Sequence, residues 1–133
     1  MAQVTGLNHI TLAVTELPRS IAFYRDLLGG HLRAGWSDGA YLELGTIWLC
    51  LTRADAVDQR TDYTHIAFSS SDYHTLAARI AAQAPLWQDN HSEGGSVYFL
   101  DPDGHRLELH DGTLETRLNH YTAHPEKGVT LYD

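Results

Sequence analysis

The chain has 133 residues, of which 43% are hydrophobic and 20% charged, and this is the composition of one ordinary globular domain. The formal charge of −8 argues against nonspecific nucleic-acid binding, and the single cysteine, Cys50, excludes an internal disulfide or a zinc site built from several thiolates. The sequence lacks an apolar run of roughly 20 residues and the features of a signal peptide, so no membrane partner and a cytoplasmic location are expected.

The first half, about residues 5–54, begins with a strand-like run over Leu7–Val14. Apolar residues at helical spacing then predict a helix over Leu17–Leu28, with Pro18 in its first turn and Gly29 at its end. Three short strands separated by glycine-containing turns are expected to follow, at His31–Trp36, Ala40–Leu44 and Ile47–Thr52.

The second half, about residues 61–112, begins with a similar strand over Tyr63–Phe68. A helix capped by Ser71 or Asp72 is expected next, because one face of the following segment is apolar. Asp101–Gly104 is a strong turn signal between the last two of the three remaining predicted strands, which are Leu86–Gln88, Ser96–Leu100 and His105–His110.

The order β-α-β-β-β therefore occurs twice, and the tripeptide Asn8–Ile10 matches Thr64–Ile66 at the same place in each half. Neither half is large enough to bury a good core alone. We interpret the chain as an α+β fold with an internal duplication, a single domain over residues 1–133 whose tail, 113–133, carries a short helix from Leu114 to Leu118.

Two histidines at equivalent places suggest a metal site. His9 and His65 lie near the starts of the matching strands, and Glu108 lies in the last predicted strand. Two imidazoles and one carboxylate leave positions open on a divalent metal, which suits Lewis-acid catalysis. The alternative is that each is an ordinary hydrogen-bonded or solvated strand residue.

Strand alternation predicts which side chains share a face. Thr11 shares a face with His9, where its hydroxyl could donate to an oxygen held by the metal. Tyr41 shares a face with Glu43, and Trp48 with Cys50. Each could line a pocket or be a packing or surface residue, and a thiol in an apolar strand is expected to be unreactive.

The glycine-containing loop 90–96 is polar but lacks the spacing and the lysine of a P-loop. Its oxygens could surround a monovalent cation or an anionic group, or the loop could be a plain hairpin connection.

Seven tracts resemble the fosfomycin-resistance glutathione transferases of the vicinal oxygen chelate superfamily, which has the glyoxalase and bleomycin-resistance fold. The resemblance covers nearly the whole chain and weakens after about Arg117. The tracts are Leu7–Val14, Ser20–Gly29, Gly39–Gly45, Trp48–Leu51, Asp62–His65, Asn90–Gly94 and Tyr98–Glu108.

The resemblance implies a domain-swapped homodimer of paired βαβββ modules, with each metal site completed across two subunits. It implies Mn²⁺ bound by His9, His65 and Glu108, with the first histidine supplied by one chain and the other two ligands by its partner. It also implies glutathione as co-substrate, a fosfomycin-like epoxide phosphonate as substrate, and K⁺ as an activator near the loop residues Asn90, Ser92, Gly94 and Ser96.

The same resemblance implies roles for single residues. Thr11 would hydrogen-bond the alkoxide that develops as the epoxide opens, and Tyr41 would contact the thiol sulfur. The phosphonate would be bound by Ser92, Tyr98 and Arg117. The substrate or glutathione cavity would be lined by Trp36, Trp48, Cys50 and Tyr63.

One departure from the family pattern concerns the phosphonate. The family has a lysine where this chain has Gln88, so we expect weaker fosfomycin handling or a shifted substrate. Three alternatives stay open: an epoxide hydrolase with Glu43 as base, a transferase that uses a different thiol, and a non-catalytic drug-binding protein. An iron dioxygenase is disfavoured by the Asn90–Gly94 and Trp48–Leu51 tracts.

Overall fold

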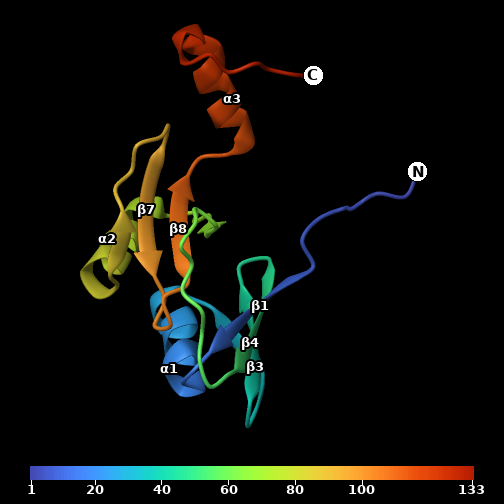
Figure 1. Ribbon diagram of the computed structural model, residues 1–133, viewed down its shortest axis with the longest axis vertical. Helices are drawn as coiled ribbons and strands as arrows, with labels where there is room; N and C mark the ends of the chain where they lie inside the picture. Colours follow the sequence, from blue (N-terminus) through green and yellow to red (C-terminus); the bar gives the residue numbers. More distant parts are fainter. The chain divides into compact units, whose positions relative to one another are not determined.

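The computed structural model describes all 133 residues, which form two compact units. Unit 1 comprises residues 1–63 and 100–105, and unit 2 comprises residues 64–99 and 106–133. The predicted βαβββ order is confirmed in both, because each unit holds a four-stranded sheet and a helix that lies between its first and second strands in the sequence (Figure 1).

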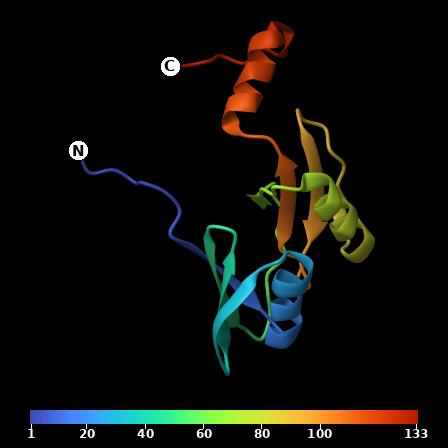
Figure 2. The same cartoon turned by 180° about the vertical axis from the view of Figure 1, so that it is seen from behind.

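The sheet of unit 1 has the order β1-β4-β3-β2. Its first strand pairs in parallel with the last, and the remaining pairs are antiparallel. Residues before β1 run clear of the sheet in both ribbon views (Figures 1 and 2). The bounds are β1 His9–Val14, β2 His31–Trp36, β3 Gly39–Leu44 and β4 Ile47–Arg53.

The predicted first helix is present but changes its winding part-way. Leu17–Ala22 is the α-helix α1, and Phe23–Leu27 continues as one π-helical turn. Gly29 ends the helix with φ 79°, a conformation that costs glycine little. Leu12 and Val14 of β1 point into the core that α1 covers, which leaves the other face of the strand to His9 and Thr11.

A buried polar turn completes unit 1. In the predicted turn Asp101–Gly104, the Asp103 carboxylate accepts from the Thr15 backbone N–H at 3.1 Å and from its hydroxyl at 2.5 Å. The hydroxyl of Tyr24, which is fully buried, donates to Asp101 at 2.7 Å. These bonds anchor the turn beside the carboxyl end of β1, the strand that carries His9 and Thr11.

Unit 2 repeats the topology of unit 1, with the order β5-β8-β7-β6 and a parallel pair formed by β5 and β8. Asp72 rather than Ser71 caps α2, since its carboxylate accepts from the Thr75 N–H. The apolar core of this unit includes Ile80, Phe99, Leu107 and Leu109. The bounds are β5 Ile66–Phe68, α2 Tyr73–Gln83, β6 Leu86–Gln88, β7 Gly95–Leu100 and β8 Arg106–Asp111.

Two elements differ in length from the prediction. The strand expected from Tyr63 begins only at Ile66, and its parallel pairing with β8 covers Ile66–Phe68. The tail helix is longer than expected: α3 spans Leu114–Ala123, and a single 3₁₀ turn follows at Pro125–Lys127. A capping box at Thr113 starts it.

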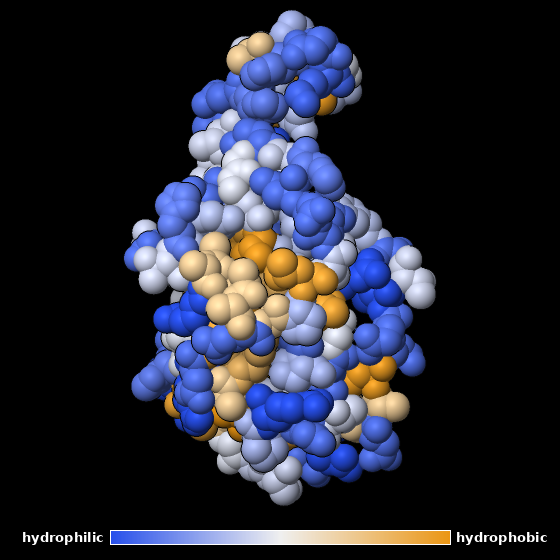
Figure 3. All heavy atoms as spheres, turned by 90° about the vertical axis from the view of Figure 1, so that its left-hand side faces the viewer, coloured by the Kyte–Doolittle hydropathy of each residue, from blue (hydrophilic) through white to orange (hydrophobic).

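The helix α3 has no buried residue, and its surface, at the top of Figure 3, is mostly hydrophilic. None of the helices has both the length and the apolar character that crossing a membrane requires.

Candidate metal and substrate site

The open face of the sheet in unit 1 collects the residues that the sequence assigned to catalysis. The strand register places Thr11 opposite Cys50, and Cys50 opposite Tyr41, so three neighbouring strands present these side chains to one face. Two residues earlier on both β1 and β4, His9 lies opposite Trp48. The predicted pairs Thr11 with His9 and Trp48 with Cys50 are therefore confirmed as sharing a face.

Aromatic rings line this face. The Trp48 ring centroid lies 4.6 Å from that of His9 and 5.3 Å from that of Tyr41, and Trp36 stacks edge-on against Tyr41 at 4.9 Å. Trp36, Tyr41 and Trp48 each keep between 38% and 49% of their surface exposed. Large aromatic surfaces of this kind are suited to binding an organic ligand.

Three other candidate site residues of unit 1 differ in their exposure and their contacts. The Cys50 thiol is buried, with 7% of the residue exposed. Glu43 forms an ion pair with Arg33 from the neighbouring strand, so its carboxylate is already engaged by a cation. Tyr63 lies outside the strands and is 57% exposed.

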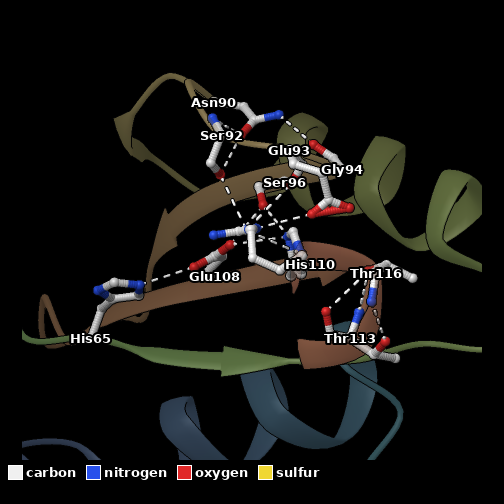
Figure 4. A network of polar contacts seen from close by, with 11 residues as sticks. His65, Asn90, Ser92, Glu93, Gly94, Ser96, Glu108, His110, Thr113 and Thr116 are labelled. Carbon is white, nitrogen blue, oxygen red and sulfur yellow. Dashed lines mark hydrogen bonds and ion pairs between the residues drawn. The ribbon is translucent and has the colours of Figure 1, made fainter. Parts of the chain in front are cut away.

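The two predicted metal ligands of unit 2 lie close together. Nε2 of His65 lies 2.9 Å from Oε1 of Glu108, and both side chains are mostly buried (Figure 4). Glu108 pairs with Ala67 on the parallel strand, and His65 lies two residues before Ala67, so the ladder aims both side chains to one face. An imidazole nitrogen and a carboxylate oxygen at this spacing fit two of the three ligands of a divalent metal.

No group of three metal-ligating side chains comes together within the chain. His9 belongs to unit 1, whereas His65 and Glu108 belong to unit 2. The pair and the single histidine therefore belong to different units of the chain.

Aromatic side chains pack around His65. Its ring centroid lies 5.4 Å from that of Trp87 and 5.9 Å from that of Tyr98. The indole N–H of Trp87 donates to the Leu107 carbonyl at 3.0 Å, which fixes the ring. Gln88 pairs with Tyr98 across a bulge in β6, so Trp87 is the extra residue, and bulges re-aim side chains in this way.

The polar loop before β7 is closed by its own residues. The Asn90 side-chain amide donates to the Gly94 carbonyl at 2.8 Å, and the Ser92 N–H donates to the Asn90 oxygen at 3.2 Å (Figure 4). Gly94 has φ 81°, which favours glycine. Ser96, expected in the same cluster, instead directs its hydroxyl to Glu108 at 2.6 Å.

Arg117 of α3 reaches back to this loop. Its Nε donates to a Glu93 carboxylate oxygen at 2.9 Å, and one Nη lies 3.5 Å from the Ser92 hydroxyl. The hydrogen bond from Arg117 lowers the pKa of the Glu93 carboxyl, and the same bond raises the pKa of Arg117. Ser92 and Arg117, predicted to bind one anion, are thus brought together beside a carboxylate.

His110 is the residue that sequence reasoning left out. Its Nδ1 lies 2.7 Å from the Ser96 hydroxyl, and its ring lines an open cleft of about 320 Å³ together with Arg117. The available signal was its place two residues after Glu108, which puts both side chains on one face of β8. Spacing alone could not identify Ser96 as the link between them.

Comparison with known proteins agrees with this architecture. The glyoxalase/bleomycin resistance protein/dioxygenase superfamily matches residues 6–109. The chain is 46% identical to the glutathione transferase FosA of Serratia marcescens, over 95% of this chain and 94% of that protein. The chain belongs to this superfamily and, within it, to the family of the glutathione transferase FosA.

Two further proteins are similar to this chain along most of its length. The metallothiol transferase FosB of Staphylococcus haemolyticus is 39% identical, over 89% of this chain and 91% of the relative. The crystal structure of a mutant fosfomycin resistance protein FosX from Listeria monocytogenes, complexed with Mn(II) and 1S,2S-dihydroxypropylphosphonic acid, superposes with a TM-score of 0.80. It is 33% identical and covers 90% of this chain and 99% of its own.

Proposed function

We propose that the chain is a metal-dependent thiol transferase that adds glutathione to the epoxide of fosfomycin or a related small phosphonate. The observation that carries the proposal is the pairing of His65 Nε2 with Glu108 Oε1 at 2.9 Å, in a chain 46% identical to a glutathione transferase FosA. A divalent metal, which we take to be Mn²⁺, would draw charge from the epoxide oxygen and orient the phosphonate.

The metal would be held by His65 and Glu108 of one chain and His9 of a second. Because one chain offers a pair and a single histidine in separate units, we propose a domain-swapped homodimer that completes each site. The face that carries His9 also carries Thr11 and Tyr41, so one half-site supplies a metal ligand and both proposed catalytic hydroxyls.

Side chains of this protein would assist the opening of the epoxide. As the thiolate sulfur bonds to an epoxide carbon, the C–O bond breaks, its electron pair stays on oxygen, and that oxygen takes up a proton. The Thr11 hydroxyl would donate to the developing alkoxide, which stabilises the transition state. Tyr41 would orient the sulfur against the wall formed by Trp36 and Trp48.

The phosphonate would be bound in unit 2. Arg117 and Ser92 meet at the loop, and Tyr98 lies beside His65. Gln88 pairs with Tyr98 at the position of the family lysine, so a neutral amide replaces a cation near the anion. Cys50 and Tyr63 would line the cavity, and K⁺ near Asn90, Ser92, Gly94 and Ser96 would activate the enzyme. We place the reaction in the cytoplasm, where thiols stay reduced.

The test combines the purified chain with Mn²⁺, K⁺, fosfomycin and glutathione, and detects the conjugate by mass spectrometry. Parallel reactions replace glutathione with cysteine or bacillithiol, which identifies the thiol. If no conjugate forms at any metal or potassium concentration, fosfomycin is not the substrate. If cells that express His9→Ala remain fully resistant, the chain acts as a drug-binding protein rather than as an enzyme.

A second candidate is an epoxide hydrolase, because a dihydroxypropylphosphonic acid is bound in the FosX structure that superposes with this chain. Its proposed base, Glu43, forms an ion pair with Arg33, so its carboxylate is already engaged by a cation. Diol formation without added thiol would favour this candidate.

A further inference from the structure

A continuous chain of polar contacts joins Arg117 to Glu108 in unit 2. One Nη of Arg117 lies 3.5 Å from Nε2 of His110, and Nδ1 of His110 lies 2.7 Å from the Ser96 hydroxyl. That hydroxyl donates to Oε2 of Glu108 at 2.6 Å (Figure 4). The other carboxylate oxygen, Oε1, faces His65.

The donor and acceptor types of these groups determine which atom donates the proton in each hydrogen bond between Arg117 and Glu108. The Ser96 hydroxyl has one proton, and it goes to Glu108 because a carboxylate can only accept. His110 must then donate from Nδ1 to the Ser96 oxygen, which leaves Nε2 as the acceptor in the neutral ring. Nε2 faces Arg117, which can only donate, so the two ends of the chain require the same tautomer.

Two glycines leave room for this imidazole. A Cβ at Gly112 would lie 2.7 Å from Nε2 of His110, and a Cβ at Gly94 would lie 3.0 Å from its Cε1. Real Cβ atoms essentially never come as close as 2.7 Å to such an atom. The backbone on two sides of the ring is therefore shaped to hold it in one place.

We propose that His110 is a positioning residue for the metal-binding carboxylate. Its Nδ1–H orients the Ser96 hydroxyl onto Oε2 of Glu108, and this leaves Oε1 beside His65 for the metal. Partners that hydrogen-bond to metal ligands in this way typically change metal affinity by about 10- to 100-fold when they are removed. The inference rests on the metal site of the proposed function and not on the identity of the substrate.

The experiment measures the Mn²⁺ dissociation constant of the full-length chain by isothermal titration calorimetry. His110→Leu removes the donor and should weaken Mn²⁺ binding by about 10- to 100-fold. His110→Asn keeps an N–H donor close to the position of Nδ1 and should bind Mn²⁺ nearly as tightly as the wild type. His74→Asn, at an exposed histidine of α2, is the matched control and should change nothing.

Two more variants test the pathway without depending on His110→Leu. Nδ1 of His110 also lies 3.5 Å from Oε2 of Glu108, the oxygen that Ser96 contacts. Ser96→Ala should weaken Mn²⁺ binding as much as His110→Leu does, and the double variant should be no worse than either, because both side chains act on that one oxygen. Gly112→Ala should displace the ring and weaken binding without removing any polar group.

The inference is overturned if folded His110→Leu binds Mn²⁺ like the wild type, or if His110→Asn is as weak as His110→Leu. Additive effects of Ser96→Ala and His110→Leu would overturn it as well. A wild-type chain that does not bind Mn²⁺ would refute both this inference and the proposed function. Tight Mn²⁺ binding without fosfomycin turnover would refute only the proposed reaction.

Discussion

Replacing Tyr24 by Phe tests the buried polar turn that anchors β1. The Tyr24 hydroxyl donates to Oδ2 of Asp101 at 2.7 Å, and the two residues are 0% and 4% exposed. The other oxygen, Oδ1, accepts from the N–H groups of Asp103 and His105. Tyr24→Phe therefore removes a single hydroxyl and leaves a buried carboxylate oxygen without this donor.

A hydrogen bond to a charged group contributes about 1.5–3 kcal/mol to stability. For a chain of this size, that loss corresponds to a fall in melting temperature of about 5–10 °C. Circular dichroism during thermal and urea unfolding measures the change. Tyr132→Phe, at a site 88% exposed, is the matched control and should stay within about 0.5 kcal/mol of the wild type. Equal stability of the two variants would refute the reasoning.

The buried Tyr24 hydroxyl also predicts how the stability of the protein changes at alkaline pH. Burial, and then the negative charge of Asp101, raise the pKa of Tyr24 well above its usual value of 10.0. A raised pKa stabilises the fold fully below the unfolded value and progressively less as the pH rises toward the folded value. The difference in stability between wild type and Tyr24→Phe should therefore narrow above about pH 10. A constant difference from pH 7 to 11 would contradict this assignment.

Three further predictions concern the proposed site. Gln88→Lys should raise kcat/KM for fosfomycin by about 10-fold or more, because a charge-assisted contact replaces a neutral one, whereas Gln88→Met should not. Thr11→Val keeps the shape of the side chain and should lower kcat by about 100-fold in the conjugation assay with little change in fold, because it removes the donor to the alkoxide. Arg117→Gln should raise the pKa of the Glu93 carboxyl toward its usual 4.5, as followed by NMR titration, and an unchanged pKa would show that another group lowers it.

The elements followed from local pattern, and so did much of the site. Strand alternation predicted that Thr11 and His9 share a face, and pairing with β4 added Trp48 and Cys50 to it. The similar sequences at the starts of the two halves predict that His9 and His65 are equivalent. In the structure, Nε2 of His65 lies 2.9 Å from Oε1 of Glu108. These inferences worked because a strand has a period of two residues and pairing preserves it.

Other features depend on tertiary contacts that a local pattern does not encode. The candidate base Glu43 is paired with Arg33, because a bulge between Leu32 and Ala34 makes Arg33 an extra residue in β2. A single inserted residue of this kind cannot be placed from alternation. Similarly, Ser96 was expected at the loop, and only the pairing of β7 with β8 shows that it joins Glu108 to His110.

The two repeats have the same strand register, but different residues occupy the positions that pair two residues after each histidine. Thr11 lies opposite Cys50, and Ala67 lies opposite Glu108, while Thr11 and Ala67 each follow a histidine by two residues. Cys50 is thus the counterpart of Glu108. A carboxylate oxygen suits a hard divalent cation such as Mn²⁺, whereas a cysteine thiolate suits softer metals. Unit 1 therefore has no carboxylate at the position that Glu108 occupies in unit 2. In the three-ligand site that we propose, His9 of a unit 1 would join His65 and Glu108 of a unit 2.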